Sequence, residues 1–395
     1  MEDRASDSGD SSTTGVLPRE KQLHPESPDK PKMRIRLCAS RPALHRNTMR
    51  AIRFYEPGVL RLDHVDLPEI GPEEILVKNA VTLTCGTDLK MYKRGHPFAK
   101  PPLIIGHEFA GVVARVGDNV QKFKESMRIV AANSAPCNAC YFCRKGKQNL
   151  CEHLDENVIG FSWPGAYAEY VRVPGHIVKQ NTLEIPNHVS FKQAAMVEPL
   201  ACVVHGIELA EIEIADTVAV IGAGPIGLLH LQLAKISGAG RTIVTDLSRQ
   251  RLDVAQELGA DDVIDAGQED QVRKVRELTG GKGGDVVIEA AGLPETWEKA
   301  IAMTRPGGVA LLFGGCRSGT SIVIDTGPLH YGERTVKGAF HHTPSCVEKA
   351  LNLISSGAVK PERLISREMP LEEVSKALDL MATGRAVKVA IRPDL

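Results

Sequence analysis

The sequence has few aromatic residues, no long apolar run and no excess of charge of either sign, and these absences exclude several classes of protein. No stretch approaches the 18 consecutive apolar residues of a membrane-spanning helix, so we expect no membrane partner. Forty-eight Lys and Arg stand against 49 Asp and Glu, a net charge of −1, which argues against a nucleic-acid binder that works by bulk charge. With only 4% aromatic residues and 36 glycines, we expect many tight turns and an interior rich in Val, Ile and Ala.

Length and overall composition indicate a folded protein of more than one domain. With 43% hydrophobic and 25% charged residues, the chain is neither disordered nor fibrous as a whole. At roughly 100–200 residues per domain, its 395 residues predict two or three domains.

The N-terminal segment lacks both a targeting signal and the apolar periodicity of a folded domain. Its first residues, MEDRASDSGDSSTTG, are acidic and polar, unlike a secretory signal or a basic transit peptide. We therefore expect a cytoplasmic protein. Residues 1–48 carry too little apolar surface to offset chain entropy, so we predict a disordered extension, with folded structure starting at Met49.

Three patterns follow one another after this segment. From 49 to 199, short strands alternate with Gly- and Pro-marked turns, which favours a β-rich barrel or sandwich-like domain. From 200 to 338, apolar runs alternate with helix-like segments, which predicts a doubly wound parallel sheet. From 339 to 395 there are two helix-like stretches and a closing strand. The clearest predicted strands are 49–55, 74–83, 109–116, 217–221, 241–245, 285–289, 309–313 and 387–391, and the clearest helices are 226–237 and 247–258.

A glycine-rich turn joins the predicted strand 217–221 to the helix that follows it. The segment Gly222-Ala-Gly224-Pro225-Ile226-Gly227 has the spacing G-x-G-x-x-G. The first glycine allows the tight turn, the second lets the backbone approach a pyrophosphate, and the third packs helix on strand, while the helix N-terminus favours phosphate. In this context the motif predicts a dinucleotide site.

An acidic residue at the end of the next strand supports this site. Asp246 stands 19 residues after Gly227, where a carboxylate is expected to bind the ribose 2′-hydroxyl and to repel a 2′-phosphate. NAD is therefore favoured over NADP. Arg249 and Arg251 lie close in sequence, and either could accept a 2′-phosphate; alternatively, Asp246 only caps the following helix.

Four of the nine cysteines lie within fifteen residues. Cys137, Cys140, Cys143 and Cys151 offer four soft thiolates at short spacing, which can close a tetrahedral zinc site without an open position. In a reducing compartment such a cluster is more typical of a metal than of disulfides. An iron–sulfur cluster is an alternative, and so are unliganded thiols.

A second group of potential ligands is spread along the chain. Cys85, His107, Glu108 and Glu198 supply a thiolate, an imidazole and two carboxylates, and three protein ligands on a zinc ion leave a position for water or substrate. Spacing alone is a modest signal, since each residue could equally be a core cysteine, a buried histidine or a surface glutamate.

These motifs, in this order, resemble those of the zinc-dependent medium-chain alcohol and polyol dehydrogenases, over residues 49–395. The resemblance rests on Cys85-Gly-Thr-Asp, Gly106-His-Glu, the four-cysteine lobe, Glu198-Pro-Leu, the glycine motif and Val244-Thr-Asp246. Within the family the chain most resembles sorbitol dehydrogenase and L-threonine 3-dehydrogenase: Glu198-Pro-Leu and Thr245-Asp-Leu-Ser resemble the polyol branch, whereas the segment 159–170 resembles the threonine branch.

The resemblance implies an α/β plus β fold. A chaperonin-10-like (GroES-like) β-barrel catalytic domain would span 49–199, with a structural zinc lobe at about 133–153. An inserted doubly wound Rossmann domain would span 200–338, and 339–395 would return to the catalytic domain. It also implies NAD, two Zn²⁺ per chain (one catalytic, one structural) and a homodimer or homotetramer.

The resemblance also implies roles for single residues. Cys85, His107 and Glu108 would surround the catalytic zinc, and Glu198 would ligate it or hold its water, with Glu108 and Glu198 exchanging places. Thr87 would accept the proton of the substrate hydroxyl. Asp246 would bind the adenosine ribose with Arg251 close to it.

One position departs from the family pattern. Lys90 stands where the family has a histidine that relays protons. A lysine of ordinary pKa, about 10.4, is a poor shuttle near neutral pH. Either its pKa is perturbed, or protons leave through Thr87 and water; Lys90 could also bind a cofactor phosphate or an anionic substrate, or be a solvated side chain. His96 is a candidate substitute.

The sequence thus predicts oxidation of a secondary alcohol, such as a polyol, cyclitol or diol, to a ketone by hydride transfer to NAD. L-Threonine 3-dehydrogenase-like oxidation of an amino alcohol is an alternative. A zinc-free enone or quinone reductase and a non-catalytic zinc- and NAD-binding scaffold are the competing hypotheses.

Overall fold

The computed structural model describes residues 48–395 of the protein. The disordered extension predicted for 1–48 lies outside the described residues except for Thr48, which begins strand β1 (Thr48–Glu56). None of the helices described in this part of the chain is long and apolar enough to cross a bilayer.

Two antiparallel-rich sheets form the part of the molecule that carries the predicted metal residues. A three-stranded sheet has the order β2-β1-β4, and a seven-stranded sheet has the order β15-β16-β3-β5-β6-β8, with β7 also paired to β3. The bounds are β2 Val59–Asp66, β3 Ile75–Leu83, β4 Leu103–Ile104, β5 Glu108–Val116, β6 Arg128–Ala131, β7 Tyr170–Val173, β8 Thr182–Glu184, β15 Ile365–Pro370 and β16 Lys388–Arg392. The strands predicted at 74–83 and 109–116 are confirmed as β3 and β5.

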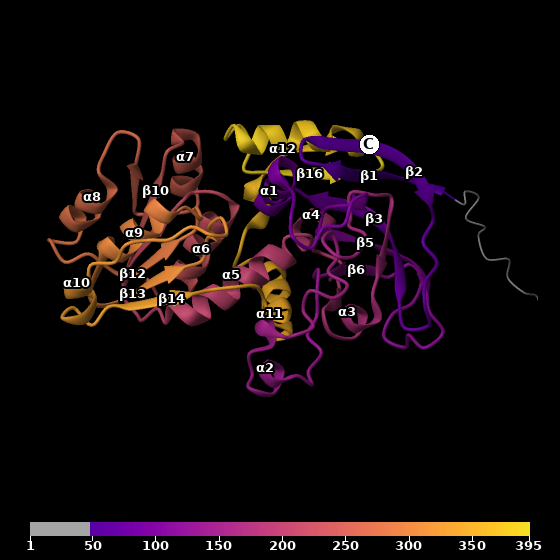
Figure 1. Ribbon diagram of the computed structural model, residues 1–395, viewed down its shortest axis with the longest axis horizontal. Helices are drawn as coiled ribbons and strands as arrows, with labels where there is room; N and C mark the ends of the chain where they lie inside the picture. Colours follow the sequence, from indigo (N-terminus) through magenta and orange to yellow (C-terminus); the bar gives the residue numbers. More distant parts are fainter. Residues whose placement is uncertain (1–47) are drawn as a thin grey trace, which may run out of the picture. The chain divides into compact units, whose positions relative to one another are not determined.

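The last strand of the chain lies next to the strand that leads into the metal residues. In β16, Ala390 and Ile391 pair antiparallel with Leu83 and Thr82 of β3. Figure 1 shows the yellow C-terminal segment returning among the indigo N-terminal strands. The final residues of the chain are therefore next to Cys85, although some 300 residues separate them in sequence.

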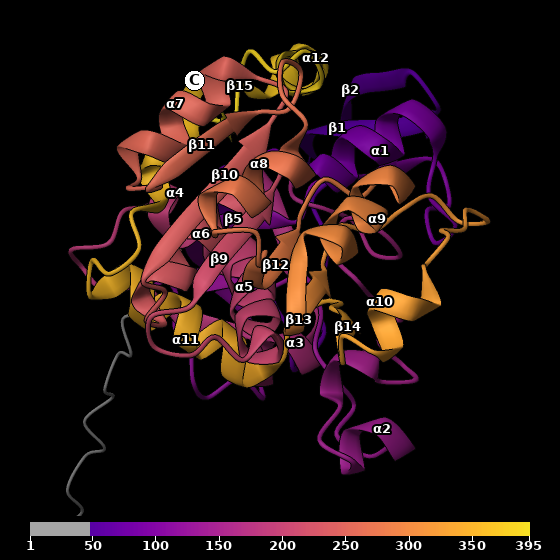
Figure 2. The ribbon, with the colours of Figure 1, turned by 90° about the vertical axis from the view of Figure 1, so that its left-hand side faces the viewer.

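A six-stranded parallel sheet forms the other large part of the described structure. Its order is β11-β10-β9-β12-β13-β14, and Figure 2 shows these strands side by side. The bounds are β9 Thr217–Ile221, β10 Arg241–Asp246, β11 Asp262–Asp265, β12 Gly284–Glu289, β13 Thr304–Leu312 and β14 Thr335–Gly338. The strand order reverses between β9 and β12, as in a doubly wound Rossmann sheet, and ligands bind at such a switch point.

Alternating residues of β9 bury both faces of this sheet. Val218 and Val220 pack in one core with helices α5 (Val197–Ala210), α6 (Pro225–Ile236) and α7 (Arg249–Glu257). Ala219 and Ile221 pack in another core with helices α8 (Gln271–Leu278) and α9 (Pro294–Met303). Two buried faces explain why this strand reads as a continuous apolar run.

Short helices are the main feature that the strand pattern missed. The predicted β-rich segment also contains α1 Gly86–Arg94, α2 Tyr141–Arg144, α3 Gly175–Gln180, α4 Phe191–Ala194 and the 3-10 helix η1 Gln148–Leu150. The predicted domain boundary at 199/200 falls inside α5. Helix α7 begins after its N-cap Ser248, two residues later than predicted, and β13 ends at Leu312 rather than at 313. The C-terminal part contains α10 Thr326–His330, α11 Pro344–Ser355, η2 Pro361–Leu364, η3 Leu371–Glu373 and α12 Val374–Ala382.

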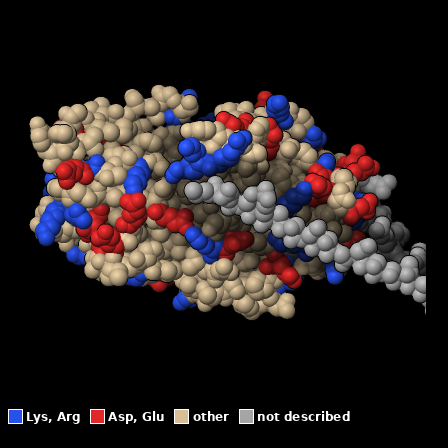
Figure 3. Space-filling view, turned by 90° about the horizontal axis from the view of Figure 1, so that it is seen from below, with Lys and Arg blue, Asp and Glu red and all other residues tan. Residues whose placement is uncertain are grey.

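Charges of both signs are mixed on the described surface. Figure 3 shows basic and acidic side chains interspersed among neutral residues on the visible described surface of one face. This distribution agrees with the net charge of −1. This face has no broad field of one sign, such as a bulk-charge nucleic-acid binder presents.

Candidate active site

Cys85 lies at the junction of β3 and α1. It is the N-cap of the helix: its Sγ accepts a hydrogen bond from the backbone N–H of Thr87 at 3.4 Å, and its own N–H donates to Asp88 Oδ2 at 3.1 Å. These two hydrogen bonds fix the Cys85 side chain at the end of β3, and a cysteine sulfur is a common zinc ligand. The local sequence therefore prepares Cys85 as a ligand.

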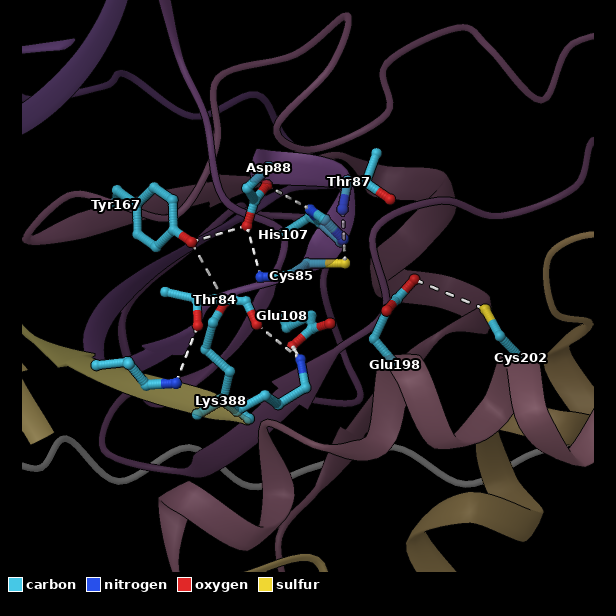
Figure 4. A network of polar contacts seen from close by, with 12 residues as sticks. Thr84, Cys85, Thr87, Asp88, His107, Glu108, Tyr167, Glu198, Cys202 and Lys388 are labelled. Carbon is cyan, nitrogen blue, oxygen red and sulfur yellow. Dashed lines mark hydrogen bonds and ion pairs between the residues drawn. The ribbon is translucent and has the colours of Figure 1, made fainter. Parts of the chain in front are cut away.

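A buried carboxylate orients the predicted histidine ligand. Asp88 is fully buried, and its Oδ1 lies 3.1 Å from Nδ1 of His107. The hydroxyl of Tyr167 donates to the other oxygen of Asp88 at 2.7 Å, as Figure 4 shows. A histidine that donates through Nδ1 keeps Nε2 as the nitrogen that can bind a metal.

Three of the predicted ligands meet in one place. The ligand atoms of Cys85, His107 and Glu108 all lie within 4.8 Å of one another. Glu108 is fully buried, and its Oε1 has no hydrogen-bond partner among the described residues. Since an unpartnered buried carboxylate oxygen is costly, this S, N and O donor set fits a zinc ion.

Glu198 lies beside this group but outside it. It is in the first turn of α5 and is buried, and burial raises the pKa of its carboxyl to about 7 in the metal-free chain. The thiol of Cys202, one turn later, lies 3.9 Å from its Oε1. The geometry places Glu108 within the ligand group and Glu198 next to it, and the predicted exchange between them stays a prediction.

Sequence analysis missed the cation that compensates Glu108. Lys388 of β16 is buried, and its ammonium group pairs with Glu108 Oε2 and donates to the carbonyl of Thr84 at 2.8 Å. Figure 4 shows this ammonium between the two residues. The only feature of the sequence that could have indicated this pair is a lysine inside the apolar strand predicted at 387–391, because a buried lysine needs a partner of opposite charge.

Lys90 connects the two large parts of the structure. Its ammonium donates to the carbonyl of Gly315, in the segment after β13, at 3.1 Å. The side chain of Lys90 is exposed to solvent, and its contact with Gly315 lies beside the carboxyl ends of the parallel strands. The candidate substitute, His96, packs edge-on against Phe161, whose ring in turn contacts that of His107, with centroid distances of 5.1 and 5.0 Å.

The four-cysteine lobe has the spacing of a tetrahedral metal site. The four sulfurs of Cys137, Cys140, Cys143 and Cys151 lie within 4.8 Å of one another, and all four residues are free cysteines. Cys140 and Cys151 sulfurs are 3.8 Å apart; thiolates across a tetrahedral zinc with bonds of 2.3 Å are separated by about 3.8 Å. Backbone N–H groups lower the pKa of Cys140 to about 6, which favours its thiolate. The lobe fits a structural zinc.

The glycine motif has the geometry of a phosphate-binding turn. Gly222 has φ +98°, and a Cβ on Gly227 would lie 1.7 Å from the carbonyl oxygen of Gly222. A Cβ on Gly224 would meet nothing within 4 Å. Gly224 is the N-cap of α6, Pro225 is its first residue, and Ile226 is half-buried. The turn leaves open space at the positive end of the helix, which fits a pyrophosphate.

Asp246 turns its carboxylate toward this loop. Its two oxygens accept from the backbone N–H of Ala223 at 2.7 Å and of Ser248 at 2.8 Å. The alternative that it caps α7 is not supported, since the N-cap is Ser248. Arg251 donates to the carbonyl of Met381 at 3.3 Å, and its Nε is buried without a partner among the described residues.

The chain is similar to known dehydrogenases over most of its length. The family model described as "Alcohol dehydrogenase GroES-like domain" matches residues 71–186, and that described as "Zinc-binding dehydrogenase" matches residues 225–356. A sorbitol dehydrogenase of Bombyx mori is 33% identical, with 84% of this chain and 95% of the relative covered. An L-threonine 3-dehydrogenase of Symbiobacterium thermophilum is 34% identical, with 88% and 99% covered.

Solved structures of dehydrogenases have the same fold. A protein described as a zinc-binding dehydrogenase from Sinorhizobium meliloti, bound to NADP, has a TM-score of 0.82 and 33% identity, covering 88% of this chain and all of that one. The predicted fold class, a GroES-like domain with a Rossmann domain, is confirmed. The roles of single residues stay predictions.

Replacing Lys388 tests the buried ion pair. Lys388→Met leaves the Glu108 carboxylate without its counter-charge, and we expect the free energy of unfolding to fall by about 3–5 kcal/mol. The double variant Lys388→Met/Glu108→Gln removes both charges and should recover most of this loss. Fluorescence of Trp163, in a Trp297→Phe background, reports unfolding of this part of the chain. A double variant no more stable than the single one would contradict the account.

Substitutions at two glycines of the turn distinguish an effect on stability from an effect on cofactor binding. We expect Gly224→Ala to leave the melting temperature unchanged and to weaken NADH binding, because its methyl group enters the open space. Gly227→Ala should lower the melting temperature, because its methyl group collides with the backbone of Gly222. Thermal unfolding and NADH fluorescence titration measure the two effects. Unchanged NADH affinity in Gly224→Ala would place the pyrophosphate elsewhere.

The ligand geometry, the family models and the relatives agree on the class of enzyme. They support the predicted NAD- and zinc-dependent dehydrogenase with two zinc ions. The chain belongs to the zinc-dependent medium-chain alcohol and polyol dehydrogenase family.

Proposed function

We propose that the protein oxidises a secondary alcohol of a small polyol, cyclitol or diol to the ketone, with NAD as the hydride acceptor. The observation that carries this proposal is the group of Cys85, His107 and Glu108, in which one buried carboxylate oxygen has no hydrogen-bond partner among residues 48–395. A zinc ion bound there supplies a Lewis acid that lowers the pKa of an alcohol, and bound NAD accepts the hydride.

The residues of the chain divide the remaining work. Asp88 holds the ring of His107, and Lys388 neutralises the buried carboxylate of Glu108. Thr87, in the first turn of α1, is the proposed acceptor of the hydroxyl proton. Lys90 holds the segment after β13 by its contact with Gly315 and is a positioning residue in this proposal, rather than the proton shuttle.

Polar side chains near the metal group support a polyol substrate. Ser134 Oγ lies 2.5 Å from Nε2 of His341, and Asn133 Oδ1 lies 3.2 Å from Nε2 of His342. Burial, and to a smaller extent the positive charges of His107 and His205, lowers the pKa of His341 to about 4. A hydroxyl and neutral imidazoles suit several substrate hydroxyls by hydrogen bonding.

An amino-alcohol substrate is the second candidate, because an L-threonine 3-dehydrogenase is among the relatives. Such a substrate needs a cation for its carboxylate, and sequence analysis named Lys90 as a residue that could bind an anionic substrate. Lys90 instead donates to the carbonyl of Gly315. The geometry therefore favours the polyol.

NAD is the proposed cofactor, although a relative of known structure holds NADP. The Asp246 carboxylate lies at the loop where the ribose is expected. The guanidinium of Arg249 contacts Asp253 and Gln256 of its own helix, away from a 2′-phosphate. We also propose a homodimer or homotetramer formed through the Rossmann domain, where β14 is an edge strand within the described sheet. The cytoplasmic location stays a prediction.

Asp246→Ser tests the cofactor preference. We expect the ratio of kcat/KM for NAD over NADP to fall about 10–100-fold, because hydrogen bonds to a charged group contribute about 1.5–3 kcal/mol. Glu257→Gln, at the exposed end of α7, removes the same charge and should leave the ratio unchanged. An unchanged ratio in Asp246→Ser would contradict the assignment.

Turnover against a substrate panel tests the reaction. We expect NADH formation at 340 nm with at least one of sorbitol, xylitol, myo-inositol and 2,3-butanediol, and loss of this activity after chelation. Faster turnover of L-threonine would select the second candidate. No turnover of any alcohol by a chain that holds one zinc ion would favour the non-catalytic scaffold.

A further inference from the structure

A third group of metal-binding side chains lies outside the two predicted zinc sites. His205 and Glu208 are on α5, and Cys346 is on α11; their ligand atoms all lie within 4.8 Å of one another. Figure 1 shows α11 running beside α5, and the two helices share one hydrophobic core. Neither the mechanism nor the four-cysteine lobe uses these residues.

Each of the three side chains is held by regular structure. His205 and Glu208 are three residues apart on α5, a spacing that puts both on one side of the helix. Cys346 is the third residue of α11, after the N-cap Thr343, whose hydroxyl donates to Cys346 Sγ at 3.1 Å. Burial raises the pKa of the Cys346 thiol, and the hydrogen bonds with Thr343 oppose this only in part, so a metal ion has to displace the thiol proton when it binds.

The separation between sulfur and oxygen fits a metal ion. Cys346 Sγ and Glu208 Oε2 are 3.8 Å apart. Ligand atoms across a tetrahedral zinc, with Zn–S of 2.3 Å and Zn–O of 2.0–2.2 Å, are separated by about 3.6 Å. A metal ion can therefore replace the thiol proton between these two atoms without moving either helix.

Solvent reaches the group from the carboxylate side. The side chain of Glu208 is 44% exposed, and it lines a groove of about 500 Å³ between α5, α6 and α11. Its other oxygen, Oε1, pairs with the ammonium of Lys349 at 2.5 Å. This cation opposes a dication, so the group should bind metal more weakly than the four-cysteine lobe.

We propose that His205, Glu208 and Cys346 form a third, solvent-accessible site for a thiophilic divalent cation such as Zn²⁺. Imidazole, carboxylate and thiolate suit zinc, and three protein ligands leave one position for water. An ion at this site ties the start of α11 to α5. The proposal does not depend on the reaction that the enzyme catalyses.

Zinc titration of the holoenzyme tests the site. We start from the full chain with its first two zinc ions bound, add ZnCl₂, and measure bound metal by equilibrium dialysis and the melting temperature. The wild type should bind a third equivalent and melt at a higher temperature, because a ligand of the native state stabilises it. Cys346→Ser should lose both effects, and Cys316→Ser, a cysteine outside the three groups, should keep them.

Charge-matched variants separate a built site from general attraction of cations. Loss of an outer-shell partner of a metal ligand lowers metal affinity roughly 10–100-fold. Glu208→Gln removes a ligand itself and should weaken binding of the third zinc ion by more than this. Glu348→Gln, an exposed neighbour on α11, removes the same charge and should leave affinity unchanged. Lys349→Gln should tighten binding several-fold, because it removes the opposing cation.

Cobalt identifies the sulfur ligand directly. Co²⁺ added to the two-zinc enzyme should give a thiolate-to-metal charge-transfer band in the wild type and in Glu348→Gln, and none in Cys346→Ser. A wild type that binds only two zinc ions, or a third equivalent that Cys346→Ser retains, would overturn the proposal.

Discussion

The arrangement of this site depends on a buried ion pair between the last strand of the chain and the first residue of β5. Lys388 and Glu108 are both inaccessible to solvent, so neither charge is stable there without the other. The pairing holds β16 beside β3 and brings the C-terminal segment against Cys85. It also leaves one oxygen of Glu108 without a partner in the described part of the chain, next to the sulfur of Cys85 and the ring of His107. The same ion pair thus compensates the charge of Glu108 and positions its other oxygen as a metal ligand.

Helix α5 connects the ligand group of Cys85, His107 and Glu108 to the parallel sheet that carries the nucleotide motif. Its first turn carries Glu198 next to the ligand group, and its middle packs against α6 and α11 in the same core as Val218 and Val220. Polar contacts of Lys90 with Gly315 and of Arg251 with Met381 join the same two parts of the chain. A dehydrogenase has to hold the reacting carbon close to the nicotinamide, and such contacts set that distance.

The residues that sequence reasoning found are those within short motifs. Gly222, Gly224 and Gly227 stand between a clear strand and a clear helix, and Cys137 to Cys151 lie in one short segment, so local spacing carries the signal. The alternation of strands and helices predicted the parallel sheet because both faces of β9 are buried. His107 and Glu108 were found through their resemblance to a family, since their spacing alone is a modest signal.

The residues that sequence reasoning missed contact partners that are distant in the sequence. Lys388 is 280 positions from Glu108, and Tyr167 is 79 positions from Asp88, so no local pattern joins either pair. The short helices α1 to α4 have between four and nine residues each, too few for a clear amphipathic repeat. Their formation depends on caps and on packing, as with the capping box of Cys85 and Asp88.

The central claim is that Cys85, His107 and a neighbouring carboxylate hold a metal ion beside the nucleotide site. Anomalous X-ray diffraction at the zinc absorption edge, from crystals grown with NADH, tests it most directly. The account predicts one strong peak among the four cysteines and a second between Cys85 and His107, within bonding distance of Glu108 or Glu198. A peak at the four-cysteine lobe alone, with NADH bound at the glycine turn, would contradict it.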